Sequence, residues 1–194
     1  KSKKNNTIVF SLQGSSLAIL ISKFFKFKII VRNGEDVLGS TIYSENIIQS
    51  LIVLLLKIFL YNFADKIITN SKGSGNSLRK ILIKKNKIHP IYNPYLKKIY
   101  TNSMNKRKKY LLSVGRLVKE KDFQNLIIAF NIIKQKIPNY KLIIIGDGQL
   151  KDELKELVNN LGLNKRILFT GWKLKLKKYY IYSRLFILNS LYEG

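Results

Sequence analysis

Tyr110–Phe130, YLLSVGRLVKEKDFQNLIIAF, decides the fold of this chain, because a strand, a turn and a helix follow one another in it. Tyr110–Val114 is a short apolar run, as in a buried strand, and Gly115 opens a turn. The apolar residues that follow recur at the three- and four-residue spacing of a helix with one buried face. They are Phe123, Leu126, Ile127, Phe130 and Ile133. The stretch therefore predicts a parallel strand that leads through a loop into an amphipathic helix.

The loop in this stretch carries two cations, Arg116 and Lys121. Ligands of open α/β sheets bind where the carboxyl ends of the strands meet the amino ends of the helices, and helix N–H groups favour anions there. Two cations in such a loop suit a diphosphate. The alternative is an ordinary strand-to-helix loop whose charges are solvated.

The same alternation of strands and helices continues on both sides. Upstream, the sequence predicts strands at Thr7–Ser11, Phe27–Val31, Lys66–Asn70 and Lys87–Tyr92, and helices at Ser15–Phe25, Glu45–Phe63 and Ser74–Lys84. Downstream, it predicts strands at Lys141–Ile145, Arg166–Thr170 and Leu185–Asn189, and helices at Leu150–Leu161 and Leu174–Tyr182. Short loops between alternating elements indicate parallel sheets with right-handed crossovers. Asn93-Pro94 ends the first half, because proline lacks the N–H that a central strand needs. We expect an N-terminal Rossmann-like domain at 1–94, a linker at 95–109 and a C-terminal Rossmann-like domain at 110–194.

Two of the expected helices in the first half are strongly apolar. The helix at Ser15–Phe25 has one apolar face, formed by Leu17, Leu20, Ile21 and Phe24. Ile47–Phe63 is the most apolar run of the chain, but polar residues interrupt it and it is short for a membrane span. We expect a buried helix there; a helix on a membrane surface is the alternative.

The composition limits the classes of function. The chain has 194 residues, 46% hydrophobic and 24% charged, as in globular proteins. The absence of cysteine excludes disulfides and thiolate catalysis, and a single histidine excludes a multi-histidine metal site. The net charge of +25 favours phosphate-rich partners, namely nucleic acid, an anionic membrane or a nucleotide ligand. Its lysines are spread along the whole chain and the common RNA-binding signatures are missing, so nucleic acid is the weakest of these candidates.

Several short motifs carry little information alone. Gly146-Asp147-Gly148 lacks the third glycine of a dinucleotide fingerprint, and Ser71–Gly75 lacks the spacing of a phosphate-binding P-loop. His89 lies inside a predicted strand, where a partly buried structural histidine is the expectation. Arg32–Asp36 follows the second strand and forms either a ligand-facing loop or a solvated one.

Taken together, these segments resemble a known family. SVGRL with Glu120-Lys121, KLIIIGDGQLKDEL, ILFTG and LFILNSLYEG are similar to the donor half of retaining GT-B glycosyltransferases of family 4. ADKIITNS, IYNP and VFSLQGSSLAILISKFFKFKIIVRN resemble parts of the acceptor domain. The resemblance implies a GT-B-like α/β fold in which two Rossmann-like parallel-sheet domains face a cleft, both incomplete in a fragment that lacks both ends of the protein.

The resemblance also implies roles for individual residues. Arg116 and Lys121 match the cations that hold the donor diphosphate, and Glu193 matches the first carboxylate of an E-x7-E pair that contacts the donor sugar. These three are the expected catalytic residues. The donor site is expected to include these three as well as Gly115, Gly171, Trp172 and Gly194. The second glutamate would lie beyond Gly194, and Arg32-Asn33-Gly34 stands where many members have a histidine. No metal and no cofactor are expected.

The main hypothesis is a retaining glycosyltransferase that moves a sugar from a nucleotide-diphosphate donor to a lipid-linked or polysaccharide acceptor in cell-envelope glycan synthesis. We expect it in the cytoplasm, peripheral on the anionic inner face of the membrane, and the fragment alone is expected to be inactive. The alternative is a non-enzymatic basic α/β module that binds nucleic acid or anionic membrane through charge. A GT-B phosphorylase or epimerase is a third option.

Overall fold

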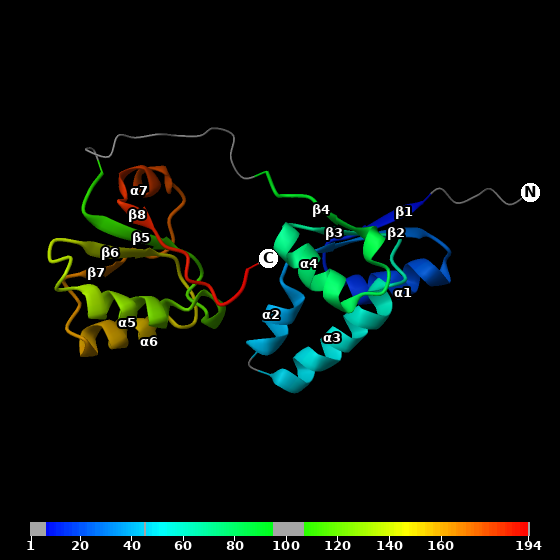
Figure 1. The fold of residues 1–194 in the computed structure, drawn as a ribbon, viewed down its shortest axis with the longest axis horizontal. Coiled ribbons are helices and arrows are strands. Elements are labelled where there is room, and N and C mark those ends of the chain that lie inside the picture. The colour runs from blue at the N-terminus through cyan, green and yellow to red at the C-terminus, as the bar shows by residue number, and fades with distance from the viewer. Residues whose placement is uncertain (1–6, 45, 95–106, 194) are drawn as a thin grey trace, which may run out of the picture. The chain divides into compact units, whose positions relative to one another are not determined.

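A computed structural model of the chain describes residues 7–44, 46–94 and 107–193 (Figure 1). The described residues form two compact units. Residues 7–44, 46–94, 192 and 193 belong to the first, and residues 107–191 belong to the second. Most of the expected linker, residues 95–106, lies outside the described part.

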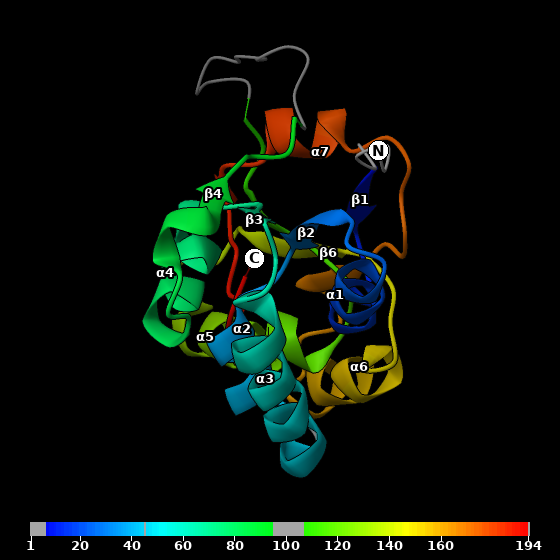
Figure 2. The ribbon, with the colours of Figure 1, turned by 90° about the vertical axis from the view of Figure 1, so that its right-hand side faces the viewer.

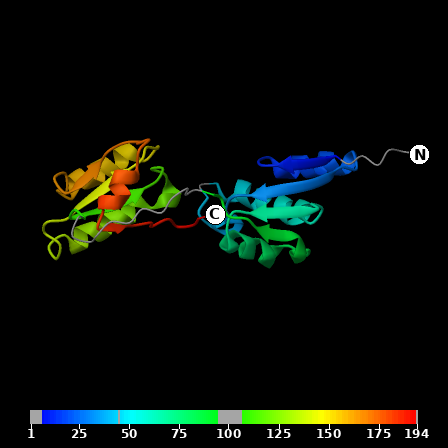
Figure 3. The same cartoon turned by 90° about the horizontal axis from the view of Figure 1, so that it is seen from above.

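The first unit is a parallel sheet in the order β1-β2-β3-β4. Its strands are β1 (Ile8–Ser11), β2 (Lys28–Asn33), β3 (Lys66–Thr69) and β4 (Ile88–Pro90). Its helices are α1 (Ser15–Phe24), α2 (Val37–Ile42), α3 (Ile47–Tyr61) and α4 (Lys72–Ile81), with a 3₁₀ turn, η1, at Lys85–Lys87. The strands follow one another in a single direction across the sheet, so right-handed crossovers put the helices on one face. Figure 1 shows them below the strands, and the strands run side by side in the view from above (Figure 3).

Polar side chains begin three of these helices. Asp36, Asn46 and Ser71 accept hydrogen bonds from Leu38 N, Gln49 N and Ser74 N, respectively. Each bond satisfies one of the backbone N–H groups that a helix leaves unpaired at its start, a contribution of about 1 kcal/mol per cap.

The second unit is a parallel sheet in the order β7-β6-β5-β8. Its strands are β5 (Tyr110–Val114), β6 (Lys141–Ile145), β7 (Ile167–Phe169) and β8 (Leu185–Phe186). Its helices are α5 (Phe123–Ile133), α6 (Lys151–Asn160) and α7 (Lys177–Tyr182), with a 3₁₀ turn, η3, at Lys119–Lys121. In Figure 1, α5 and α6 lie on one face of this sheet and α7 lies on the other. The unit is therefore doubly wound, with its strand order reversing at β5.

In the second unit, most residues predicted on the buried face of α5 lie in the core. Phe123, Leu126, Ile127 and Phe130 of α5 are all buried among residues of β5, β6 and α6. Ile133, expected on the same face, is 40% exposed because it lies in the last turn of α5. The predicted elements begin and end within about three residues of their observed bounds, with the largest differences at the end of α4, the start of α7 and the end of β8.

The first unit contradicts the prediction of a buried helix at Ile47–Phe63 and leaves the apolar face predicted for α1 exposed. Most of the apolar side chains of α3 are exposed, and only Leu60 and Tyr61 of this helix are buried, so the buried-helix prediction is wrong. The four apolar residues predicted on one face of α1 are likewise exposed, and Ser15, Ile19 and Ser22 point inward instead. The sequence also gave no sign of α2, which Asp36 initiates where a polar loop was expected.

Candidate functional site

The reversal of strand order between β5 and β8 marks one place in the second unit as a ligand site. Helices leave neighbouring strands toward opposite faces at such a point, which opens a crevice at the carboxyl ends of the two strands. The loop after β5 carries Arg116 and Lys121, and the loop after β8 carries Asn189 and Ser190. The topology thus places the two predicted cations at the edge where open α/β sheets bind ligands.

Glycine turns pack backbone against backbone along this edge. Gly115 N donates to Ile145 O at 3.0 Å, and Gly146 N donates to Gly171 O at 3.1 Å. A Cβ on Gly146, whose φ is 151°, would lie 1.8 Å from Gly115 O, and a Cβ on Gly148 would lie 2.5 Å from Leu117 O. Gly146 and Gly148 are therefore required by the close approach of the turn after β6 to the turn after β5. The sequence indicates only a tight turn here, because the close approach joins segments that are distant in the chain.

Arg116 projects from the first of these turns. Its side chain is 73% exposed and forms an ion pair with Glu120, four residues along, whose side chain is 27% exposed. An arginine keeps its charge at any physiological pH, and its planar group offers several donors, so one carboxylate partner leaves donors for an anion.

Lys121 is half-buried at the end of η3. Its aliphatic stem lies beside the first turn, since a Cβ on Gly115 would be 3.5 Å from Lys121 Cγ. That distance is ordinary van der Waals contact, so the stem packs beside the turn, and this packing restricts where the ammonium group can reach.

Asn189 fixes the loop that carries Lys121. Its Nδ2 donates to Lys121 O at 2.9 Å and to Asp122 O at 2.5 Å, and Leu191 N donates to Glu120 O at 2.9 Å. Asp122 has a left-handed backbone, with φ 49°, and precedes α5 without a side-chain cap. Asn189 was not predicted as a site residue; its only signal in the sequence is an amide directly after an apolar strand.

Gly171 and Trp172 follow β7 on the far side of β6. Gly171 has φ 69°, a conformation that favours glycine, and its carbonyl accepts the bond from Gly146 N. The Trp172 side chain is 69% exposed, so its indole faces solvent. A flat exposed ring at a strand end is suited to stacking on a planar ligand.

Glu193 lies in a different unit from the two cations. It is exposed and follows Tyr192, whose ring stacks on Tyr43 of the first unit at 6.1 Å between centroids. Gly194 lies outside the described residues. The predicted convergence of Glu193 with Arg116 and Lys121 stays a prediction, because each unit is described by itself.

The second unit, whose strand ends carry Arg116 and Lys121, matches a known protein family. The sequence pattern of the family described as Glycosyl transferases group 1 matches residues 97–194. This chain belongs to that family.

Curated glycosyltransferases are similar to this chain over both of its units. An uncharacterized glycosyltransferase of Methanocaldococcus jannaschii is 33% identical over 195 residues, which cover 91% of this chain and 47% of the relative. The N-acetylgalactosamine-N,N'-diacetylbacillosaminyl-diphospho-undecaprenol 4-alpha-N-acetylgalactosaminyltransferase of Campylobacter jejuni is 33% identical over 180 residues, covering 90% and 48%. The chain therefore spans about half the length of these relatives.

A solved structure confirms the fold. HepE of Anabaena in complex with UDP-glucose has a TM-score of 0.73 to this chain at 20% identity, covering 94% of this chain and 53% of HepE. The prediction of a GT-B-like α/β fold with two Rossmann-like parallel-sheet domains is confirmed, whereas the cleft between the domains stays a prediction.

In the first unit, hydrogen bonds from side chains connect the carboxyl ends of β2, β3 and β4. Arg32 donates to Asn93 Oδ1 at 3.2 Å, and Asn70 donates to Gly34 O at 2.9 Å. Asn33 is buried and donates to Glu35 O at 2.6 Å. The Arg32–Asp36 loop is therefore held at the carboxyl edge of its sheet rather than loosely solvated.

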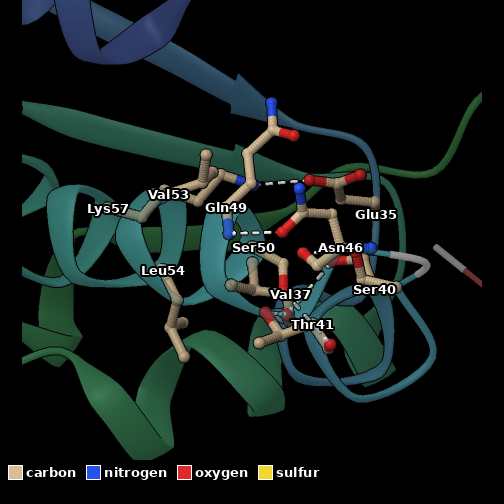
Figure 4. A pocket seen from close by; sticks show the side chains of 11 residues that line it. Glu35, Val37, Ser40, Thr41, Asn46, Gln49, Ser50, Val53, Leu54 and Lys57 are labelled. Carbon is tan, nitrogen blue, oxygen red and sulfur yellow. Dashed lines mark hydrogen bonds and ion pairs between the residues drawn. The ribbon is translucent and has the colours of Figure 1, made fainter.

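A pocket of about 210 Å³ lies beside this loop, between α2 and α3 (Figure 4). Lys57 donates to Glu35 across its rim at 2.5 Å. Ser40 and Thr41 donate to Val37 O, and the Asn46 side chain caps α3. These polar groups already serve the two helices, so the pocket is built chiefly from structural contacts.

His89 corrects another prediction. It was expected to be partly buried, but it is exposed because its side chain points from the helix-free face of β4, an edge strand. Its Nε2 lies 3.3 Å from Lys66 Nζ. Lys66 begins β3, whereas His89 lies level with Arg32 across the sheet.

Two further findings concern metals and membranes. Within the described residues, no group of three or more histidine, cysteine, aspartate or glutamate side chains is placed to hold a metal ion. Over the same residues, every helix is too short or too polar to cross a membrane. In the turn after β6, Asp147 and Lys151 pair at 2.9 Å; the hydrogen bond from Lys151 lowers the pKa of Asp147 and raises that of Lys151.

Proposed function

We propose that the full-length protein is a retaining glycosyltransferase that uses a nucleotide-diphosphate sugar as donor and a lipid-linked or polysaccharide acceptor of the cell envelope. Family membership and the undecaprenol-linked name of the Campylobacter jejuni relative support this class of reaction. The complex of Anabaena HepE with UDP-glucose supports a nucleotide sugar as donor.

One observation carries the proposal. Arg116 and Lys121 lie at the switch point of a doubly wound sheet, on a loop that Asn189 and Leu191 tie to the end of the neighbouring strand. Cations held there by backbone and amide contacts face the place where such a sheet binds its ligand.

These cations would act on the leaving group. When the bond between the sugar carbon and the diphosphate oxygen breaks, negative charge grows on the diphosphate. Preorganised cations stabilise that charge more in the transition state than in the ground state, which raises the rate. Glu120 would orient the Arg116 guanidinium toward the phosphates through the ion pair that they form.

The remaining donor contacts are assigned by their places at the strand ends. Gly115 would let a phosphate approach the first turn closely, and Trp172 would stack on the nucleotide base beside Gly171. Glu193 would bind hydroxyl groups of the donor sugar, with Gly194 offering its backbone N–H. In this proposal the two cations replace a metal ion, and no cofactor takes part, so a chelator such as EDTA would leave turnover unchanged.

The proposed acceptor implies that the protein works at a membrane. A lipid-linked acceptor lies in a bilayer, and a protein with a net charge of +25 is attracted to an anionic leaflet such as the inner face of the cytoplasmic membrane. We place the protein there as a peripheral protein.

The test uses the full-length protein with three alanine variants. Arg116→Ala and Lys121→Ala should each lower donor turnover on the order of a hundredfold and weaken UDP binding measured by calorimetry. Lys119→Ala, an exposed lysine of the same 3₁₀ turn, is the matched control and should change neither. Wild-type turnover in both test variants would exclude the diphosphate assignment. NMR of the product would decide retention, because an inverted anomeric carbon contradicts it.

The alternative of a basic binding module makes opposite predictions. It requires nucleic-acid binding that falls steeply with salt whatever the sequence, and no saturable binding of UDP. The same calorimetry, run with UDP and with a duplex DNA, separates the two.

A further inference from the structure

The solvent-facing side of α3 is apolar over its whole length. Ile48, Ile52, Leu55 and Phe59 follow at spacings of four, three and four residues and are 54–71% exposed. Such spacing places the four side chains in one stripe along the helix. Ser50, Lys57 and Tyr61 lie on the opposite side, which packs toward the unit. The helix thus reverses the usual arrangement, in which charged side chains face water.

Helix α1 has the same reversed arrangement. Leu17, Leu20, Ile21 and Phe24 form its outer stripe and are 50–80% exposed, whereas Ile19 and Ser22 are buried. The two helices pack against each other, and Figures 1 and 2 show them side by side on the helix-covered face of the sheet. Their stripes therefore belong to one surface, which we call the α1/α3 face.

Aromatic side chains and lysines gather at one end of this face. Phe24 and Phe25 pack edge to face at the end of α1, and Phe59 and Phe63 do so at the end of α3. Asn62 Oδ1 accepts hydrogen bonds from Ile83 N and Lys84 N, both at 3.1 Å, and so holds the segment after α4 beside α3. Ile83 is 85% exposed there.

The charges around the face are mainly positive. Neither α1 nor α3 contains an aspartate or glutamate. Four lysines lie at the end of α1 or at the Asn62 contact, and two carboxylates lie nearby, Asp65 paired with Lys23 and Glu35 paired with Lys57. These lysines are Lys23, Lys26, Lys84 and Lys85. An apolar stripe with aromatic side chains and a cationic rim is the arrangement of helices that lie in the plane of an anionic membrane surface.

We propose that the α1/α3 face is the surface by which the protein docks on an anionic lipid bilayer, with the two apolar stripes at the acyl boundary and the lysines among the headgroups. At about 1.5 Å per residue, the 15 residues of α3 are roughly 22 Å long, less than the hydrocarbon thickness of about 30 Å, so the helix lies in the interface rather than across it. A face covered by another part of the polypeptide or by a second copy would not need the cationic rim. The proposal deepens the proposed function by naming the membrane-docking surface.

The test is co-sedimentation of the full-length protein with vesicles of phosphatidylcholine alone and of phosphatidylcholine mixed with phosphatidylglycerol, without nucleotide sugar. The double variant Ile52→Gln/Leu55→Gln should weaken binding to the anionic vesicles at least tenfold. Lys84→Gln/Lys85→Gln should weaken anionic binding and leave neutral binding unchanged. Ile132→Gln, at a still more exposed isoleucine of α5 in the second unit, is the control and should stay within twofold of wild type.

Three results would overturn the proposal. The first is unchanged anionic binding in the Ile52→Gln/Leu55→Gln variant, which would mean that another surface docks or that the polypeptide itself covers the face. The second is a wild-type dimer that the same variant converts to monomer in sedimentation experiments. The third is equal binding of the wild type to neutral and anionic vesicles. Because the sites are exposed, the variants should keep the wild-type circular dichroism spectrum and UDP affinity; loss of UDP binding would instead concern the proposed function.

Discussion

Helices α3 and α5 are both strongly apolar, yet the structure treats them in opposite ways. In the second unit, α5 turns Phe123, Leu126, Ile127 and Phe130 onto the sheet and its neighbour α6. In the first unit, α3 packs against α1 and α2 and turns its longest apolar stripe to solvent. The comparison teaches that hydrophobic periodicity identifies an apolar face without saying what covers it.

The difference follows from how each helix is placed on its unit. The residues of α5 from Phe123 to Phe130 that face inward pack on core residues of β5, β6 and α6, and its exposed large apolar residues are confined to Ile128, Ile132 and Ile133. Apolar side chains surround much of α3, and its inward side includes a serine, a lysine and a tyrosine. Both units nevertheless have a buried apolar core, to which α5 contributes four large side chains and α3 contributes only Leu60 and Tyr61.

The largest expected effect comes from truncating one phenylalanine in each helix. Phe130→Ala should destabilise the second unit by about 3–5 kcal/mol, because the ring is 2% exposed and its removal leaves a cavity. Phe59→Ala, at a ring that is 65% exposed, should stay within about 0.5 kcal/mol. Denaturant-dependent hydrogen exchange at amides of β5 and β2 measures the two units separately. Equal losses in the two variants would abolish the contrast between the helices.

The next effect concerns the glycine edge of the second unit. Gly146→Ala should cost more than about 2 kcal/mol and weaken UDP binding, because its Cβ would overlap Gly115 O at 1.8 Å. Gly162→Ala is the matched control: it also has a positive φ, 65°, but nothing lies within 4 Å of its Cβ, so about 1 kcal/mol is expected. Similar costs for both variants would show that backbone conformation, not close approach, makes Gly146 necessary.

A smaller effect is expected at the tie between β8 and the cation loop. Asn189→Ala removes two hydrogen bonds to Lys121 O and Asp122 O and should cost about 1–3 kcal/mol, with weaker UDP binding. Asn164→Ala, whose side chain donates only to Asn159, should have little effect on either quantity. UDP affinity that stays unchanged in Asn189→Ala would mean that the loop holds its shape without the tie.

The smallest effect tests the polar ties of the first unit through pH. Burial alone would raise the pKa of Asp65, but hydrogen bonds from Ile29 N at 2.8 Å and Lys23 Nζ at 3.2 Å lower it below its usual value of 3.8. A carboxyl group with a lowered folded pKa stabilises the fold above its unfolded pKa, and this stability is lost as pH falls through the folded pKa.

Asp65→Asn should therefore reduce the unfolding free energy at pH 7 by less than about 1 kcal/mol, since both partners of the ion pair are 41% exposed. The gap between wild type and variant should shrink as pH falls below about 4. Unfolding curves at pH 7 and pH 3 measure it. A gap that widens at pH 3 would contradict the assigned direction of the pKa shift.

The sequence predicted the order of strands and helices because those signals are local. Apolar runs such as Tyr110–Val114 and spacings such as Phe123 to Phe130 depend only on neighbours along the chain. The two cations were found in the same way, as charges in a strand-to-helix loop. Asp36 as the start of α2 was missed because a helix of six residues has too short an apolar pattern.

The features that failed depend on contacts between distant residues. The exposure of the apolar side chains of α3 could not be deduced, because periodicity does not tell which elements cover a helix. Gly146 looked like an ordinary turn until Gly115 O was seen against it. Asn189 gained its role only when β8 was placed beside β5, a pairing that the order of elements in the sequence does not specify.

The hydrogen bonds from Asn189 to the backbone of Lys121 and Asp122 also have a consequence for folding during synthesis on the ribosome. Asn189 is separated from its two partners by 68 and 67 residues, and of the described strands of the second unit β8 is the last to be made. Strands β5, β6 and β7 can pair while the chain is still growing, but the cation loop gains its anchor only after Asn189 has left the exit tunnel. A nascent chain halted at Phe186 would carry both cations and still lack the fixed loop that presents them.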